Sequence, residues 1–305
     1  MTDQYNTPHS EDSLGIDFKQ LLDIFKDNLK IIALTTMAFA LLSVTASLNI
    51  PNVYSSRTIL TITEKELGGG STSGAGAGLG GIAAMAGIQI ASSPNDLSFI
   101  VIETVKSHDF FKHLIQIDGV LENIYAAEGY DFSTGKILFD NNIFDASSKK
   151  WLIAKPTYVS AYGKYISSIN ISKNKTNGFL YLNFKHFSPQ FAKDFTNLMV
   201  REINNVIRKK DLQDSSRSMK FLKAKLRDTN EIEIRLTINE LIKSDLKTQT
   251  FANIKEHYAV EPIDTAYLPF QKTSPARALI CIFGTIIGFI FSYLFFVVRS
   301  LLSQK

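Results

Sequence analysis

The stretch ALICIFGTIIGFIFSYLFFVV, residues 278–298, decides the fold, because it is an uncharged run of 21 residues between Arg277 and Arg299. A second uncharged run, IIALTTMAFALLSVTASLNI, occupies residues 31–50. At a rise of about 1.5 Å per residue, a helix of either length spans roughly 30 Å, the thickness of the hydrocarbon core of a bilayer. The two runs therefore predict two transmembrane helices with all the residues between them on one side of a membrane.

Two other interpretations of these runs stay open at the level of sequence. Each run is also compatible with a buried core helix, and residues 31–50 contain several Ser, Thr and Asn residues. A cleaved signal peptide has a short basic region before its apolar core, whereas residues 1–30 are long, polar and rich in acids. An uncleaved anchor fits better.

Lys and Arg flank both runs on both sides, so the signal for the orientation in the membrane is weak. We expect short inner tails and a large outer domain.

This interpretation divides the chain into five parts. They are a cytoplasmic tail (1–30), a first transmembrane helix (31–50), a periplasmic domain (51–277), a second transmembrane helix (278–298) and a short cytoplasmic tail (299–305). The middle part is long enough to bury its own core. The only cysteine, Cys281, lies in the second run, so the middle domain is compatible with an oxidising compartment.

The first part of the middle domain mixes strand and helix signals. Residues 53–63 (VYSSRTILTIT) alternate and are rich in β-branched side chains, which predicts a strand. Residues 68–87 form a Gly-rich loop of small and apolar residues. A helix is expected over 97–117. The Asn-Gly pair between residues 166–172 and 179–187 predicts a β-hairpin.

A long helical region is predicted over residues 189–260. Ser188 and Pro189 form a helix start, and no Gly or Pro occurs from 190 to 261. Apolar residues recur at spacings of three and four, as in helices that pack as coiled coils. We expect one very long helix, or two or three in series, with weak points at 211–216 and 228–231. Such a helix exceeds any compact core, which favours lateral packing against other copies.

Basic residues gather in the first half of this helical region, where nine Lys and Arg stand against three acids over residues 201–227. Two interpretations remain open for this band. It is either a solvated face with local ion pairs, or a surface that pairs with acids of a neighbouring copy or with an anionic glycan. The candidate basic band consists of Arg208, Lys209, Lys210, Arg217, Lys220, Lys223, Lys225 and Arg227.

Prolines and glycines mark two further candidate structural sites. Pro262, Pro269 and Pro275 exclude helix over 261–275 and predict an extended strut that returns the chain to the second span. In the second span, Gly284 and Gly288 form a GxxxG pair that permits close helix packing with another copy or with a partner protein. A chance pair of small residues in an apolar run is the alternative.

Signatures of catalysis are missing from the sequence. It contains no HExxH, GxSxG or Walker motif, and its five histidines lack metal-ligand spacing. We therefore predict no catalytic, cofactor-binding or metal site and no enzyme activity. The formal net charge of +4 is mild, and no basic arm with interleaved aromatics is present, so nucleic acid is excluded as a partner.

The chain resembles the Wzz-type polysaccharide chain-length determinants, a class of polysaccharide co-polymerase. The resemblance is carried by the order of the parts and by two stretches. These are GFLYLNFKHFSPQFAKDFTNLMVREIN at 178–204 and the run from 258 to 288, which includes IDTAYLP and SPARALICIFGTIIG. The resemblance implies an α+β fold, with two transmembrane helices flanking a periplasmic domain that has a membrane-proximal α/β base and a very long extended helix.

The same resemblance implies a function. It implies a homo-oligomeric ring in the bacterial inner membrane, in contact with membrane lipids. There the ring acts as a scaffold on the Wzy polymerase, sets the length of O-antigen or related glycans, and has the lipid-linked glycan as a further candidate partner. Some relatives carry a cytoplasmic tyrosine kinase with phosphate-binding loops, and the sequence ends at residue 305 without one, so such a kinase is expected to be a separate protein.

Three other functions are rivals to this one. An export adaptor of a capsule or exopolysaccharide system differs little in sequence and is the main alternative. A periplasmic sensor needs an output domain after the second span, which seven residues do not supply. A glycan hydrolase needs a carboxylate pair in a cleft, and the acids over 228–245 are expected on a helix surface instead.

Overall fold

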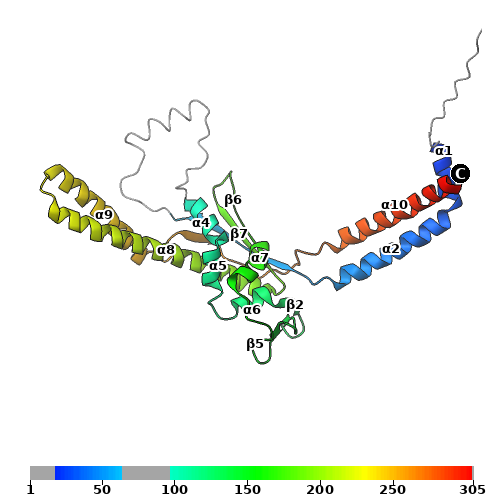
Figure 1. Cartoon of the computed structure of the whole chain (residues 1–305), viewed down its shortest axis with the longest axis horizontal. Helices are drawn as coiled ribbons and strands as arrows, with labels where there is room; N and C mark the ends of the chain where they lie inside the picture. The colour runs from blue at the N-terminus through cyan, green and yellow to red at the C-terminus, as the bar shows by residue number, and fades with distance from the viewer. Residues whose placement is uncertain (1–17, 64–96, 304–305) are drawn as a thin grey trace, which may run out of the picture. The chain divides into compact units, whose positions relative to one another are not determined.

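The computed structural model describes residues 18–63 and 97–303 and has the predicted mixed α+β architecture (Figure 1). The Gly-rich loop predicted at 68–87 and most of the tail at 1–30 lie outside the described residues. Contacts divide the chain into two compact units, one of residues 1–50 with 274–305 and the other of residues 51–273. Each unit is described separately.

The first unit is built from the two apolar runs. Helix α2 (Leu29–Asn49) and helix α10 (Arg277–Ser303) cover both of them, and the short α1 (Phe18–Asp27) precedes α2. The hydroxyl of Thr35 donates to the hydroxyl of Ser292 at 2.6 Å, and Ser43 lies against Gly284. Since higher residue numbers in α2 meet lower ones in α10, the two helices form an antiparallel hairpin.

The second unit contains a four-stranded antiparallel sheet in the order β6-β7-β1-β8. The strands are β1 (Tyr54–Ile62), β6 (Ile169–Lys173), β7 (Leu180–His186) and β8 (Val260–Asp264). The strand predicted at 53–63 and the hairpin around Asn177-Gly178 are both confirmed. Buried and exposed residues alternate along β1 and β7, as expected for a sheet with one face in a core.

Helices close the buried face of this sheet. They are α4 (Leu97–Lys106), α7 (Tyr158–Ser168) and the inner part of α8, and α5 (His108–Leu114) and α6 (Val120–Tyr125) pack on these helices. Two small hairpins lie between α6 and α7 in sequence: β2 (Ala127–Asp131) with β3 (Lys136–Phe139), and β4 (Phe144–Asp145) with β5 (Lys150–Trp151). In the core, Phe184 of the sheet packs on Phe195 of α8, and Phe111 stacks on Tyr165.

The helix predicted over 97–117 is instead two helices. Ser107 separates α4 from α5, and its hydroxyl accepts the Phe110 amide at 3.1 Å. A Ser side chain that caps a new helix competes with continuation of the old one. The prediction missed this cap because the apolar pattern runs through the break.

The long helical region is a helical hairpin rather than a series of helices that run on in one direction. Helix α8 (Pro189–Asp228) has 40 residues, roughly 60 Å, and α9 (Ile232–Ile254) returns along it. The side chains of Gln249 and Ser216 are hydrogen-bonded at 3.1 Å across the pair. The weak point predicted at 228–231 is the turn. The one predicted at 211–216 is wrong, because Ser215 is buried and α8 continues through it.

The segment after α9 also departs from the prediction. Residues 255–259 are not helical, and the strut expected from residue 261 begins as strand β8, which pairs with β1 at Pro262 and Leu60. Pro262 is tolerated because β8 is an edge strand. The next residues are irregular but attached: Ser56 donates to the Tyr267 carbonyl at 2.7 Å, and Asn197 accepts the Ala266 amide at 3.2 Å.

Candidate functional site

The apolar helix pair is the first candidate site. Both α2 and α10 are long and apolar enough to cross a membrane. Only 11% of the apolar window of α2 and 22% of that of α10 is buried, and large side chains such as Leu34 and Phe291 are about two-thirds exposed (68% and 64%). A core helix of a soluble domain would be mostly buried, so the described packing does not support that alternative.

The GxxxG pair permits close helix packing within the chain. A Cβ atom added at Gly284 would overlap with Ser43, and one added at Gly288 would overlap with Phe39. Both neighbours belong to α2 of the same chain, whereas the sequence suggested another copy or a partner protein. The pattern continues to Ser292, which is buried and bonded to Thr35. Small residues at 284, 288 and 292 thus let α10 approach α2 closely.

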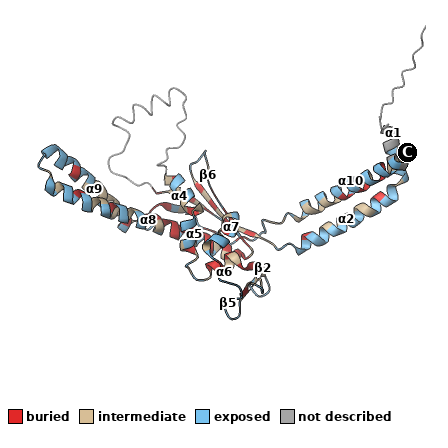
Figure 2. Cartoon of the chain, viewed as in Figure 1, coloured by how far each residue is buried: buried red, intermediate tan, exposed pale blue. Residues whose placement is uncertain are grey.

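The basic band lies in the outer half of α8, which we define as residues 208–228. Figure 2 shows this half mostly exposed, in contrast to the inner half, residues 189–207, which is buried on the sheet. Arg208 is not available for a partner. Its guanidinium donates to the carbonyls of Lys255 and Glu256 at 2.8 and 2.6 Å and ties the end of α9 to α8. The other seven members of the band are exposed.

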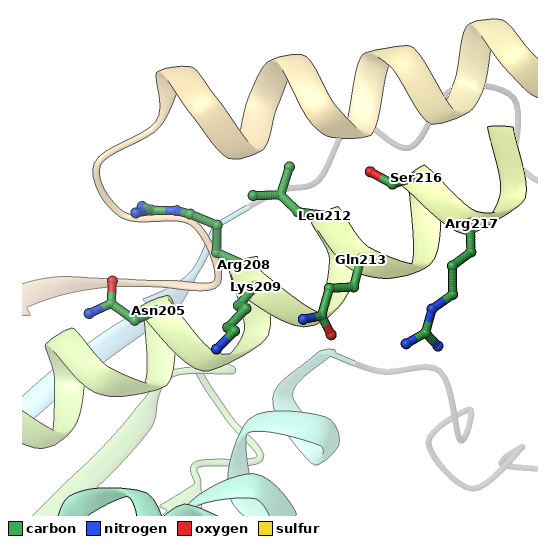
Figure 3. Close-up of a pocket in the computed structure, with 7 residues that line it drawn as sticks. All are labelled: Asn205, Arg208, Lys209, Leu212, Gln213, Ser216 and Arg217. Carbon is green, nitrogen blue, oxygen red and sulfur yellow. The ribbon is translucent and has the colours of Figure 1, made fainter. Parts of the chain in front are cut away.

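Four residues of α8 form a row on the side away from α9. Asn205, Lys209, Gln213 and Arg217 point to this side, whereas Leu212 and Ser216 point toward α9 (Figure 3). Their spacing of four residues is that of a surface ridge on a helix. The row lines a shallow trough of about 520 Å³.

A second cavity, here called the α5–α8 cavity, opens beside this row. Its volume is about 300 Å³, at the lower end of the range of ligand pockets. α8 contributes Asn205, Lys209 and Gln213 to both hollows. The remaining lining comes from α4, α5 and α8: Thr104, Ser107, Asp109, Phe110, His113, Val206 and Lys210.

Several polar groups around the α5–α8 cavity have no partner. The Ser107 hydroxyl is engaged in the cap of α5 and donates to the Thr104 backbone carbonyl. Within residues 18–63 and 97–303, five polar lining side chains make neither a hydrogen bond nor an ion pair: Thr104, Asp109, Lys209, Lys210 and Gln213. The fold therefore does not use these charges internally, and they are free to contact a ligand.

A hydrogen bond between His113 and Glu202 borders one wall of the cavity. His113 Nε2 lies 2.8 Å from a carboxylate oxygen of Glu202, and the Arg201 guanidinium donates to the other oxygen at 3.1 Å. Burial opposes ionisation of Glu202, but hydrogen bonds from His113, Arg201 and Asn205 lower the pKa of this carboxyl below its ordinary value. The pair joins α5 to α8, so its role is to hold the wall in place.

The titratable side chains form no candidate metal centre in the part of the chain that the structure describes. No group of three or more His, Cys, Asp and Glu side chains is placed to hold a metal ion there. Among the described histidines, only His186 has a strongly perturbed pKa: it is buried, and burial lowers its pKa to about 4. Its Nδ1 accepts the Ser188 amide and its Nε2 donates to the Asn123 carbonyl, so it ties the end of β7 to α6 and α8.

The three candidate prolines do not form one strut. Pro262 lies in β8, Pro269 is buried in the irregular segment that follows, and Pro275 precedes α10.

The sequence identified the basic band but missed the α5–α8 cavity. The four-residue spacing of Asn205, Lys209 and Gln213 was a visible signal, whereas their contact with α5, about 90 residues earlier, was not.

Comparison with known proteins supports the resemblance. The family model of the Wzz chain length determinant proteins matches residues 15–116, which include α2 and β1. The chain is therefore similar to this family over its first third, while the two stretches at 178–204 and 258–288 that suggested the resemblance lie outside the match. A solved structure described as a full-length bacterial polysaccharide co-polymerase is similar over 95% of this chain and 99% of that chain, with a TM-score of 0.43 and 14% identity. No curated protein matches the chain.

Proposed function

We propose that this protein is a non-catalytic regulator of the chain length of O-antigen or a related surface polysaccharide. The observation that carries the proposal is the match of residues 15–116 to the chain length determinant family, together with a hairpin of two exposed apolar helices at the ends of the chain. In this proposal α2 and α10 anchor the protein in the bacterial inner membrane, and residues 51–277 lie in the periplasm.

The regulator acts as a homo-oligomeric scaffold on a Wzy-type polymerase. Exposed apolar side chains on α9 support self-association: Ile232 is 76% exposed and Leu236 is 62% exposed. Large exposed apolar groups on a helical hairpin are typical of surfaces that meet another protein. The length of α8, roughly 60 Å, offers such a surface over many turns.

Deletion of the gene tests this function. We expect surface polysaccharide on a gel ladder to lose its clustered size distribution while polymer is still made, and a plasmid copy of the wild-type gene to restore the cluster. An unchanged ladder contradicts the proposal. Polymer that keeps its size distribution but fails to reach the surface indicates an export adaptor instead.

A fusion experiment tests the proposed topology. Alkaline phosphatase is active only in an oxidising compartment, so its insertion into the turn between β6 and β7, after Lys175, is expected to give activity. Fusion after residue 305 is expected to give none. Activity at the second position but not the first reverses the proposed orientation.

A further inference from the structure

We propose that the α5–α8 cavity binds a segment of the sugar polymer, with Lys209, Lys210 and Asp109 as its principal polar contacts. This inference rests on the proposed function and specifies where the glycan meets the protein. The trough of Figure 3 continues the site along α8, through Gln213 to Arg217.

The composition of the cavity favours a ligand with many hydroxyl groups. A hydroxyl both donates and accepts hydrogen bonds, and the unpaired groups of the cavity supply both roles. The two Lys ammonium groups donate only, the Asp109 carboxylate accepts only, and the Gln213 carboxamide does both. A ligand that carries anionic groups alone would meet Asp109 unfavourably, whereas a sugar uses all four.

The excess of positive charge favours acidic sugars over neutral ones. Two cations face one carboxylate in the cavity, and Arg217 adds another cation at the end of the trough. Glu202 does not cancel this charge, because His113 and Arg201 already hold it. A carboxylate or phosphate substituent on the sugar therefore gains charge-assisted hydrogen bonds from Lys209 and Lys210.

The walls of the cavity suit the non-polar face of a sugar ring. Phe110 and Val206 line the cavity, and because Phe110 is buried, the half-buried Val206 supplies most of the accessible apolar surface. Both also belong to the packed core or lie against it, so this surface is held in place before a ligand arrives. A preformed site loses less free energy to ordering when it binds.

Their place in the cavity lining distinguishes Lys209 and Lys210 from the rest of the band. Arg208 is used by the fold, whereas Lys209 and Lys210 are exposed and make no hydrogen bond or ion pair within the described residues. Their replacement is therefore expected to leave the fold intact. Lys220 and Lys223 are also exposed and lie outside both hollows, so they offer a matched control on the same helix.

Titration calorimetry on the full-length protein in detergent micelles tests the inference. The probes are oligosaccharides released by mild acid from the surface polysaccharide of the host, with neutral dextran for comparison. We expect saturable binding to the wild type, about tenfold weaker binding to Lys209→Gln/Lys210→Gln, and about a twofold change or less in Lys220→Gln/Lys223→Gln. Asp109→Asn is expected to weaken binding several-fold, and added salt to weaken binding of acidic probes.

Three results overturn the inference. They are absence of saturable binding to the wild type, equal loss in the two double variants, and a fall in the oligomer mass of Lys209→Gln/Lys210→Gln by light scattering with unchanged glycan binding. The last result assigns the cavity to a contact between copies. The gene deletion is independent of these outcomes, so a changed ladder with no glycan binding refutes this inference alone.

Discussion

The inner and outer halves of α8 belong to one continuous helix but have different surroundings. Ten residues of the inner half are buried against the sheet and its helices, whereas only Ser215 and Leu222 are buried in the outer half. The outer half has α9 as its main neighbour and exposes most of the basic band. The inner half thus contributes to stability, and the outer half is free to vary its surface for binding.

The difference follows from what each half packs against. The inner half covers a sheet face that is mostly apolar, so its Ala192, Phe195, Met199 and Ile203 lose contact with water on one side of the helix. The outer half pairs with a single helix, and a two-helix contact buries only a narrow stripe. The remaining faces of both helices must therefore be polar or must meet another molecule.

The largest expected effect contrasts a Phe from each half. Phe195→Ala removes a side chain that is 1% exposed and packed on Phe184 and Phe191, and we expect it to lower the free energy of unfolding by about 3–5 kcal/mol. Phe221→Ala in the outer half, where the ring is 61% exposed, is expected to change it by about 0.5 kcal/mol or less. Urea unfolding in detergent measures both, and equal losses would refute the contrast.

The next largest effect concerns two adjacent asparagines at the boundary of the halves. The Asn204 side chain accepts the amides of Ala259 and Val260 and donates to the Val260 carbonyl at 2.9 Å. Asn204→Ala leaves these buried groups without partners, so we expect a loss of about 2–3 kcal/mol. Asn205→Ala, at an exposed position, is the control and should lose much less; the same unfolding assay compares them.

A pH dependence is expected from His186, which lies at the end of β7 beside the inner half. Burial lowers the pKa of His186 to about 4 from its ordinary 6.5, and its ring packs on Phe191. Between these values the unfolded chain binds a proton that the folded chain does not. The contribution of neutral, buried His186 to the free energy of unfolding is therefore complete above about pH 6.5. It falls as the pH drops, by up to about 1.4 kcal/mol per pH unit.

Unfolding measured between pH 4 and 7.5 tests this expectation. His186→Gln keeps a donor and an acceptor but does not titrate, so its stability should depend less on pH in this range. The difference between variant and wild type at pH 7.5 isolates the cost of the altered hydrogen bonds. An identical pH dependence in both proteins would show that folding does not lower the pKa of His186.

The smallest expected effect is at the far end of the outer half. The Arg235 guanidinium donates to the carbonyls of Leu226 and Thr229 at 2.9 and 3.0 Å and so caps α8 at the turn into α9. Arg235→Gln should cost about 0.5–1 kcal/mol, seen as faster hydrogen exchange over 226–235 with little change elsewhere. Arg227→Gln is the control, and a global loss of stability in Arg235→Gln would show that the turn supports more than itself.

Much of the architecture follows from local patterns in the chain. The apolar runs predict α2 and α10 because the length and composition of each run are sufficient to identify a helix that could span a membrane. The alternation in β1 predicts a half-buried strand, and Asn177-Gly178 predicts the hairpin that joins β6 and β7. The cap at Ser188 predicts the start of α8, where the Ser188 hydroxyl accepts the Phe191 amide at 3.2 Å. Each of these signals lies within a few residues of the feature that it predicts.

Other features depend on contacts between distant segments, which no local pattern encodes. The continuation of α8 through 211–216 depends on burial against α9, and the conversion of 260–264 from strut to strand depends on pairing with β1. The partner of Gly284 is Ser43, more than two hundred residues away. Asp109 and Lys209, which are likewise distant in the sequence, line the same α5–α8 cavity. Spacing and composition establish which helices and strands form. Only packing brings α5 beside α8, because the free energy of this contact comes from apolar surfaces of distant segments that meet as the chain folds.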